Sequence, residues 1–436
     1  MFCVTNRRKH KHPGTVLPVT VSRREPALEL LRKLTERGLI YQMTAEEKLS
    51  ELLDGPSLSF YIGFDATAGS LHLGHLVPLM IARHLQNEGH KPIIIVGGGT
   101  ALVGDPSCRS VERSFESKET VSAWVDSISA QMEHFLDFKS QENRALLLDN
   151  YSWLSKMNYL DFLRDVGRHF SVNRMLSAES VKLRLETGIS FLEFSYSLLQ
   201  AFDFLHLYRS HNCVLQVGGS DQWGNIVAGI DLIRRSEGAE TWGFTCPLVT
   251  TVSGEKMSKS QTGGAIWLDP SMTTPYDYYQ FWINIDDKDA VYFLKLYTFI
   301  PMNEIEELSL LEGAEIRRVK ERLAFETTAL THGREEAFKA EKASRALFAG
   351  NGDQEDVPSL EIPVKRLRNG ISCLDLFVET GLCPSRSEVR RLAKQGGLYI
   401  GDDRVNDPVD NLDPENTSES ILLRAGKKRY YKVIFR

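Results

Sequence analysis

Two histidines three residues apart, His72 and His75, stand where a short apolar run gives way to a helical pattern. Imidazoles at a helix N-terminus can lie beside a phosphate that also interacts with the positive end of the helix dipole. Gly74 between them would let a ligand approach the backbone closely. An isolated H-x-G-H is more often a local hydrogen-bonding group, so this motif needs support from elsewhere. A zinc site is disfavoured because no cysteine or carboxylate lies nearby at ligand-like spacing.

A second pair of candidates, Lys256 and Lys259, lies in the segment Gly254-Glu-Lys-Met-Ser-Lys-Ser260. Two lysines on a Gly/Ser-rich loop can close over a polyphosphate and neutralise its developing charge. An isolated K-x-x-K is more commonly part of a solvated loop. The Gly97-Gly98-Gly99 run does not match the dinucleotide fingerprint, since Leu102 stands where its third glycine should be, and the chain has no P-loop motif. Dehydrogenase and P-loop NTPase functions are therefore disfavoured.

The predicted elements around these residues alternate between strand and helix. Apolar runs predict strands at 60–64, 93–96, 145–148, 214–217 and 244–249, and longer patterns predict helices at 76–88, 119–135, 159–169, 191–208 and 223–235. This alternation predicts an α/β fold with a doubly wound, Rossmann-like parallel sheet covered on both faces. Ligands of such sheets bind beyond the carboxyl ends of the strands, so the candidate loops are correctly placed for chemistry.

After residue 275 the pattern becomes helical, with amphipathic segments at 304–311 and 316–330, and the last module mixes a helix at 385–394 with strands at 398–400, 421–423 and 430–434. We therefore predict a basic, disordered N-terminal tail (1–26), a Rossmann-like catalytic domain (27–250), a lysine-containing loop and connection (251–275), an α-helical domain (276–350), an acidic linker (351–362) and a small α+β domain (363–436). The last domain carries a net charge of +4 on a chain whose total is −6. This asymmetry is typical of an enzyme with an attached polyanion-binding module.

Composition narrows the cellular location. The chain of 436 residues has no apolar run near the roughly 18 residues that cross a bilayer. Its six cysteines are scattered without a C-x-x-C pair, which favours reduced thiols over disulfides or structural zinc. Residues 1–24 are basic, but Pro13-Gly14 and Pro18 interrupt them and no secretion-signal core is present. We predict a cytoplasmic protein, with organellar import as the alternative if residues 1–24 act as a transit peptide.

The two motifs together resemble a known family. His72-Leu-Gly-His75 resembles the HIGH signature, and Lys256-Met-Ser-Lys-Ser260 resembles the KMSKS signature, of class I aminoacyl-tRNA synthetases. Longer segments, spread over the chain from about Leu28 to Arg436, resemble bacterial-type tyrosyl-tRNA synthetases: 61–68 (YIGFDATA), 104–107 (GDPS), 150–151 (NY), 193–203 (EFSYSLLQAFD), 218–225 (GGSDQWGN) and 424–431 (RAGKKRYY).

The resemblance implies a tyrosine–tRNA ligase. Such an enzyme activates L-tyrosine with ATP to tyrosyl-adenylate and pyrophosphate, then transfers the tyrosyl group to the 3′-terminal adenosine of tRNA(Tyr). It implies Mg²⁺ with ATP but no protein-ligated metal, no editing domain, a homodimer and no membrane association. Two alternatives remain open at this point: a non-catalytic RNA-binding relative of the same fold, and a tryptophanyl enzyme.

The resemblance also implies residue roles. Tyr61 and Asp203 would hold the phenolic hydroxyl of tyrosine, and Asp105, Tyr196 and Gln200 its ammonium group. Elementary chemistry agrees, because one carboxylate can accept from the phenol while another pairs with the ammonium. A site that bonds the hydroxyl rejects phenylalanine, which would leave buried polar groups unpaired. Tyr196, Gln200 and Asp203 could instead be one face of an ordinary helix.

For ATP, the resemblance implies contacts from Gly63, Asp65, Thr67, His72, His75, Gly219, Asp221, Lys256, Lys259 and Ser260. It places Gln222 near the carboxylate of the bound tyrosine. The implied catalytic set is His72, His75, Lys256, Lys259, Arg109 and Arg113. The chain departs from the family pattern at Ala66, Cys108 and Arg109.

The C-terminal module resembles an S4 RNA-binding domain, and its implied tRNA contacts are Arg386, Arg390, Arg391, Lys394, Lys427, Lys428 and Arg429.

Overall fold

The computed structural model describes residues 29–107, 116–185, 188–250, 265–349, 359–383, 385–401, 403–414, 417–426 and 429–436. The predicted N-terminal tail lies outside these ranges. So do seven predicted site residues, namely Arg109, Arg113, Lys256, Lys259, Ser260, Lys427 and Lys428. In the described part of the chain, no helix is long and apolar enough to span a bilayer.

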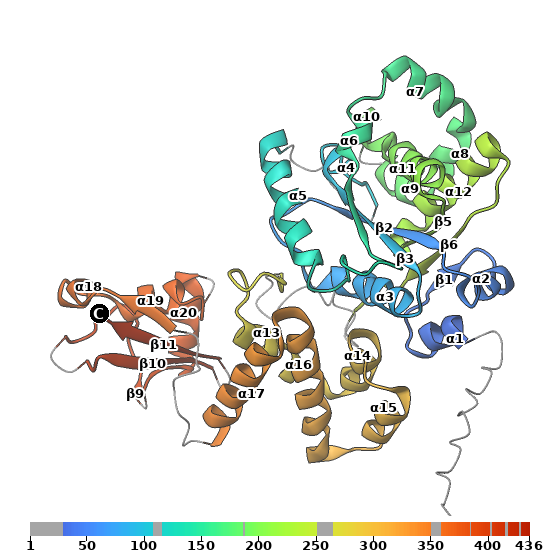
Figure 1. The fold of residues 1–436 in the computed structure, drawn as a ribbon. Coiled ribbons are helices and arrows are strands. Elements are labelled where there is room, and N and C mark those ends of the chain that lie inside the picture. Colours follow the sequence, from blue (N-terminus) through green and yellow to red (C-terminus); the bar gives the residue numbers. More distant parts are fainter. Residues whose placement is uncertain are drawn as a thin grey trace, which may run out of the picture.

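A six-stranded sheet of order β1-β6-β5-β2-β3-β4 forms the centre of the first domain (Figure 1). Its strands are β1 (Gln42–Met43), β2 (Ser59–Asp65), β3 (Lys91–Gly97), β4 (Leu146–Asp149), β5 (Cys213–Gly219) and β6 (Trp242–Cys246). All pairs are parallel except β1 with β6. The predicted doubly wound α/β class is therefore confirmed, whereas the two-residue edge strand β1 was not predicted. The strand predicted at 244–249 ends at Cys246, before Pro247, which has no N–H to donate.

The side chains of β2 and β3 alternate between two layers of helices, as a pleated strand requires. Phe60, Ile62 and Ile94 belong to a core with α3 (Leu76–Asn87) and α5 (Lys118–Met132). Tyr61 and Ile93 belong to a second core with α11 (Tyr196–His211) and α12 (Trp223–Glu237). β2 pairs with β3 on one side and with β5 on the other, so the topological switch lies between β2 and β5, where ligands of open α/β sheets bind.

Short helices surround this framework. They are α1 (Glu29–Glu36), α2 (Glu46–Leu53), α4 (Gly98–Ala101), α6 (Tyr151–Leu154), α7 (Tyr159–Asp165), α8 (Val172–Ser177), α9 (Glu179–Leu185) and α10 (Phe191–Phe194), with 3₁₀ turns η1 (Leu73–His75), η2 (Gly167–His169) and η3 (Ser220–Gln222). The single helix predicted at 191–208 is interrupted at Ser195, which separates α10 from α11.

The helical domain contains α13 (Pro275–Ile283), α14 (Ala290–Tyr297), α15 (Met302–Ser309), α16 (Ile316–His332) and α17 (Arg334–Ala349), with 3₁₀ turns η4 (Asp287–Asp289) and η5 (Gly313–Glu315). Its buried residues continue the core formed by α3 and α5. Arg37, just after α1, donates to the carbonyls of Lys295, Thr298 and Ile300 at 3.1, 2.8 and 2.5 Å, so its buried guanidinium joins the two domains.

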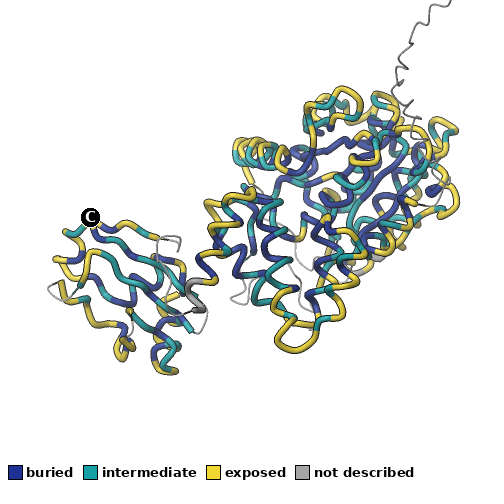
Figure 2. Tube along the Cα trace, turned by 60° about the horizontal axis from the view of Figure 1, so that its bottom comes forward, coloured by how far each residue is buried: buried dark blue, intermediate teal, exposed yellow. Residues whose placement is uncertain are grey.

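The C-terminal domain has a separate core, visible in Figure 2 as its own group of buried segments beyond the helical domain. Its elements are β7 (Ser359–Ile362), α18 (Val364–Arg368), α19 (Cys373–Glu379), α20 (Arg386–Lys394), β8 (Leu398–Ile400), β9 (Asp403–Arg404), β10 (Ser420–Ala425) and β11 (Arg429–Phe435), with sheet order β7-β11-β10-β8-β9. The linker predicted at 351–362 is too long. Its last four residues form β7, which pairs in parallel with β11 and which composition alone could not distinguish from linker.

Candidate active site

A cavity of about 390 Å³ opens at the carboxyl ends of β2, β3 and β5, beside the N-terminus of α11. Its lining includes every described residue predicted to bind tyrosine or ATP, namely Tyr61, Gly63, Asp65, Thr67, His72, His75, Asp105, Tyr196, Gln200, Asp203, Gly219, Asp221 and Gln222. These side chains come from segments far apart in the sequence and meet because parallel strands bring their carboxyl ends to one edge.

The closed end of the cavity contains Tyr61 and Asp203, which are 2% and 3% exposed. Asp203 accepts from Asn150 Nδ2 at 2.9 Å and from Trp153 Nε1 at 2.7 Å. Burial raises the pKa of Asp203 to about 7, and the two hydrogen bonds oppose that rise. The Tyr61 hydroxyl and the Gln216 side-chain oxygen are buried and have no hydrogen-bond partner in the described part of the chain. These two groups can therefore form hydrogen bonds with a polar atom of a ligand.

Asp65 and Tyr196 connect the middle of the cavity to this closed end. Tyr196 Oη donates to Asp65 Oδ2 at 2.8 Å, and Thr100 Oγ1 donates to Asp65 Oδ1 at 2.6 Å. Asn150 Nδ2 also donates to Thr100 Oγ1 at 3.0 Å, so a hydrogen-bonded network extends from Asp65 to Asp203. Because its proton is directed at Asp65, the Tyr196 oxygen keeps acceptor capacity for a ligand ammonium.

Gly97 shows how tightly this network is packed. An ideal Cβ on Gly97 would lie 2.4 Å from Asp65 Oδ1 and 2.3 Å from Thr100 Oγ1, so only glycine fits here without displacing them. Gly97 of the Gly97-Gly98-Gly99 run therefore allows close packing beside the Asp65 carboxylate, although the run does not match the dinucleotide fingerprint.

Asp105 and Gln222 form a second polar group in the cavity lining. Gln222 Nε2 donates to Asp105 Oδ2 at 2.7 Å, and the backbone N–H of Ser107 donates to Asp105 Oδ1 at 2.8 Å. Asn225 Nδ2 in turn donates to Gln222 Oε1 at 3.0 Å, which fixes the orientation of the amide. Gln222 Nε2 also donates to Asp221 Oδ2 at 3.3 Å, so one amide links two carboxylates of the cavity lining.

His72 and His75 form a stacked pair at the start of η1, with ring centroids 3.8 Å apart and planes inclined by 14°. His72 Nδ1 accepts from the Gly74 N–H at 3.0 Å, and His75 Nδ1 accepts from the His72 N–H at 3.2 Å. Burial lowers the pKa of His72, and burial together with His72 lowers the pKa of His75 well below its usual value. A neutral imidazole that accepts at Nδ1 carries its proton on Nε2, so both rings are neutral Nε2–H donors.

Four residues of the site escaped prediction as site residues. Thr100 and Trp153 gave no sequence signal, Gln216 lies within a buried strand, and Asn150 entered only as part of a resembling dipeptide. Each of them orients another side chain or faces the closed end of the cavity. Residues in such roles do not occur at a characteristic spacing along a sequence.

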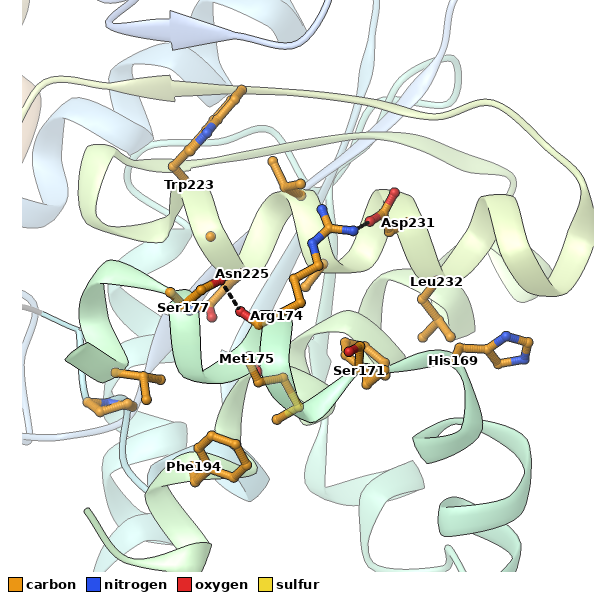
Figure 3. A pocket seen from close by; sticks show the side chains of 18 of the residues that line it. His169, Ser171, Arg174, Met175, Ser177, Phe194, Trp223, Asn225, Asp231 and Leu232 are labelled. Atoms are coloured by element: carbon orange, nitrogen blue, oxygen red, sulfur yellow. Dashed lines mark hydrogen bonds and ion pairs between the residues drawn. The ribbon is translucent and has the colours of Figure 1, made fainter. Parts of the chain in front are cut away.

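A second cavity of about 260 Å³ lies between α8, α10 and α12 (Figure 3). Its lining is mainly apolar, with Met175, Phe194 and Trp223 among its residues, and an Arg174–Asp231 ion pair lies at its edge. It contains none of the predicted site residues. In the described residues, no three or more His, Cys, Asp or Glu side chains gather as a metal-binding group.

In the C-terminal domain, four predicted RNA contacts lie on α20, as expected: Arg386, Arg390, Arg391 and Lys394. Arg386 pairs with Asp375 and Arg391 with Glu388. Arg429 donates to the Leu382 carbonyl at 2.7 Å. Arg390 and Lys394 are exposed and have no ion pair with any described residue.

Comparison with known proteins agrees with this geometry. Residues 54–349 match the family model of class I tRNA synthetases (W and Y), and residues 351–433 match the SYY-like C-terminal domain of tyrosine–tRNA ligases. The first domain and its cavity are thus those of a class I aminoacyl-tRNA synthetase.

The tyrosine–tRNA ligase of Caldanaerobacter subterraneus subsp. tengcongensis is 49% identical over 408 residues, which cover 93% of this chain and 99% of that protein. That of Acetivibrio thermocellus is 48% identical over 402 residues, with 92% and 98% covered. A C-terminally truncated Aspergillus nidulans mitochondrial tyrosyl-tRNA synthetase superposes with a TM-score of 0.67 at 30% identity, over 73% of this chain and 94% of that one. The chain belongs to the tyrosine–tRNA ligase family.

Proposed function

We propose that the cavity joins L-tyrosine to ATP, forming tyrosyl-adenylate and pyrophosphate, and then transfers the tyrosyl group to the 3′-terminal adenosine of tRNA(Tyr). One observation carries this proposal. A single cavity combines a buried, hydroxyl-binding end at Tyr61 and Asp203 with a pair of neutral imidazole donors at His72 and His75. Membership of the tyrosine–tRNA ligase family supports the same reaction.

Tyrosine would lie with its phenol at the closed end. There its hydroxyl donates to Asp203 and contacts the Tyr61 hydroxyl, which has no partner in the described residues. Its ammonium would bind Asp105, the Tyr196 oxygen and Gln200, and its carboxylate would lie near Gln222. Two separate polar groups of the cavity lining support this orientation, namely the buried carboxylate of Asp203 and the hydrogen-bonded pair of Asp105 and Gln222.

ATP would bind at the open side, with its phosphates against His72 and His75. Gly63 is exposed, and a Cβ there would meet nothing within 4 Å, so the strand leaves room for a ligand beside Asp65 and Thr67. Gly219 and Asp221 at the end of β5 would hold the ribose. The tyrosine carboxylate oxygen attacks the α-phosphorus, the bond to the bridging oxygen breaks, and pyrophosphate leaves with that electron pair.

Such phosphoryl transfer requires positioning and charge stabilisation more than acid–base catalysis. Neutral imidazole donors suit this role, since they bond phosphate oxygens without exchanging a proton. Lys256, Lys259, Ser260, Arg109 and Arg113 remain predicted partners of the leaving pyrophosphate. Mg²⁺ would enter on the phosphates of ATP and neutralise their charge.

The helical and C-terminal domains would bind the tRNA in this reaction. The helical domain would face the anticodon arm, and the C-terminal domain would bind RNA through α20, where Arg390 and Lys394 offer cations that no described carboxylate neutralises. Arg386, Arg391 and Arg429 already have partners and would have to exchange them for phosphates, while Lys427 and Lys428 remain predictions. Contacts of this kind make tRNA affinity fall steeply with salt.

A homodimer is supported by an apolar face on α7, α8 and α10. Its members are large apolar side chains left exposed in this chain: Tyr159, Leu160, Leu163, Val172, Phe191 and Leu192, with Leu160 at 73% and Phe191 at 67%. A face of this kind marks an interaction site, and a second copy is the partner that a symmetric pairing of the same patch would provide. In the same region of the chain, Arg184 of α9 and Glu193 of α10 form a bidentate ion pair that is almost fully buried.

A cytoplasmic location remains the prediction. The four described cysteines, Cys213, Cys246, Cys373 and Cys383, are buried and not in disulfides, as in a reducing compartment. Fluorescence of a C-terminal fusion, with and without residues 1–24, would distinguish the cytoplasm from an organelle.

The deciding experiment is amino-acid-dependent exchange of pyrophosphate into ATP, with tyrosine, phenylalanine and tryptophan compared side by side. We expect exchange with tyrosine alone. Exchange with tryptophan would indicate the tryptophanyl enzyme instead, and no exchange by folded protein with Mg²⁺ would favour a non-catalytic RNA-binding relative. Charging of tRNA(Tyr) by the same preparation then tests the second step.

A further inference from the structure

Trp267 lies against the histidine pair although no sequence motif includes it. An isolated antiparallel bridge pairs Trp267 with His72. The Leu73 N–H donates to the Ile266 carbonyl and the Leu268 N–H donates to the Leu71 carbonyl, both at 2.9 Å. These bonds flank the pair rather than joining it, so His72 and Trp267 occupy a non-hydrogen-bonded position, where opposite side chains share a face and approach most closely.

The neighbours of the pair fix which way both side chains point. Leu71, Leu73, Ile266 and Leu268 are all buried in the main core, at 0, 0, 7 and 3% exposure. Because side chains alternate along an extended segment, the side chains of His72 and Trp267 must leave on the other face, and both are only half-buried. Further bonds secure the segment, with the Trp267 N–H donating to Thr273 Oγ1 at 3.0 Å and the Asp269 N–H to Ser70 Oγ at 3.2 Å.

The result is a row of four aromatic rings. The Trp267 and His72 centroids are 6.2 Å apart, the His72 and His75 centroids 3.8 Å, and the His75 and Phe64 centroids 5.8 Å. Phe64 limits one end of the histidine stack and Trp267 limits the other. The Gly74 N–H donates to His72 Nδ1, and the indole adds a ring contact that restricts rotation of the imidazole away from His75.

We propose that Trp267 is a positioning residue for the histidine pair: opposite His72 in the bridge, its indole holds that ring in its stack on His75, with both Nε2–H donors presented to a phosphate. This inference rests on the proposed role of the pair in ATP binding. Trp267 would act through His72 and not by touching a substrate, because it is absent from the cavity lining to which His72 and His75 belong, and its effect should fall on ATP because the pair is assigned to the phosphates.

The test is a double-mutant cycle in pyrophosphate exchange, with Trp267→Ala, His72→Ala and the double variant, and with KM for ATP and for tyrosine measured separately. We expect Trp267→Ala to reduce kcat/KM for ATP about 10- to 100-fold, the order of loss produced by a misplaced catalytic contact. The KM for tyrosine should change less than about twofold. In the His72→Ala background the same substitution should add less than about threefold, because two residues that act through one contact are not additive.

Two further variants separate positioning from general damage. Trp267→Phe retains a ring opposite His72 and should recover most of the loss. Trp242→Ala removes an equally half-buried indole from the first residue of β6, at the opposite end of the strand from the cavity, and should leave the ratio of the two KM values unchanged. Equal losses for ATP and tyrosine, or multiplying losses in the double variant, would overturn the inference alone. Wild-type ATP kinetics in His72→Ala would overturn the proposed role of the pair, and this inference with it.

Discussion

Replacing Trp153 by phenylalanine should move the pH dependence of tyrosine binding. The Trp153 indole donates to Asp203 at 2.7 Å, a short bond to a carboxyl group that is 3% exposed. Phenylalanine removes this donor but keeps an aromatic ring over His206, on which Trp153 stacks at 4.5 Å. The substitution therefore tests the hydrogen bond more than the packing.

The magnitude follows from the environment of Asp203. A hydrogen bond to a charged group stabilises it by about 1.5–3 kcal/mol, which corresponds to a pKa rise of about 1–2 units when the bond is lost. Burial already raises the pKa of Asp203 to about 7. At about pH 7.5 the ionised fraction would then fall from about three quarters to between about a quarter and a few per cent. If ionised Asp203 accepts from the phenol, KM for tyrosine rises roughly 3- to 25-fold.

The sign of the pH effect is fixed by the same argument. The carboxylate form appears as pH rises through the pKa, so KM for tyrosine should fall with rising pH around pH 7 in the parent protein and level off about one unit above the pKa. In Trp153→Phe the decrease in KM for tyrosine should occur at a pH about 1–2 units higher than in the parent protein. KM values from pyrophosphate exchange between about pH 6 and 9, measured for both proteins, test this shift. Trp124→Phe, on α5, is the matched control. An unchanged pH profile of KM for tyrosine in Trp153→Phe, with unchanged ATP kinetics, would show that the Trp153 hydrogen bond does not set the ionisation of Asp203.

Three further predictions concern packing and assembly. Gly97→Ala should lower activation by about 10- to 100-fold because its Cβ would displace Asp65; unchanged exchange kinetics would contradict this. Arg184→Met leaves Glu193 buried without its ion-pair partner and should reduce the free energy of unfolding by about 3–5 kcal/mol, measurable by denaturant titration; a loss below 1 kcal/mol would count against it. Phe191→Asp should convert a dimer to monomers in sedimentation velocity, whereas a parent chain already monomeric would exclude the proposed dimer.

Much of the fold was predictable because its signals are local. The buried strands β2, β3 and β5 appear as short apolar runs, and α3, α12 and α16 appear at nearly their observed bounds. Local patterns failed where an element depends on distant partners. β1 has two residues and exists because β6 offers an edge, and β7 follows an acidic Gly/Pro stretch and is a strand only because β11 pairs with it.

The candidate tyrosine- and ATP-binding residues could be predicted from the sequence, since Tyr61, Asp105, Asp203 and His72 stand in long, ordered motifs near strand ends or on a predicted helix. The residues that orient them are found only in the folded chain. Trp153 reaches Asp203 from another helix, and Trp267 meets His72 across a two-segment bridge. This difference arises because a residue that binds by its own chemistry needs a particular side chain, whereas a residue that orients another needs only to lie beside it. That proximity is a property of packing, and no spacing along the chain encodes it.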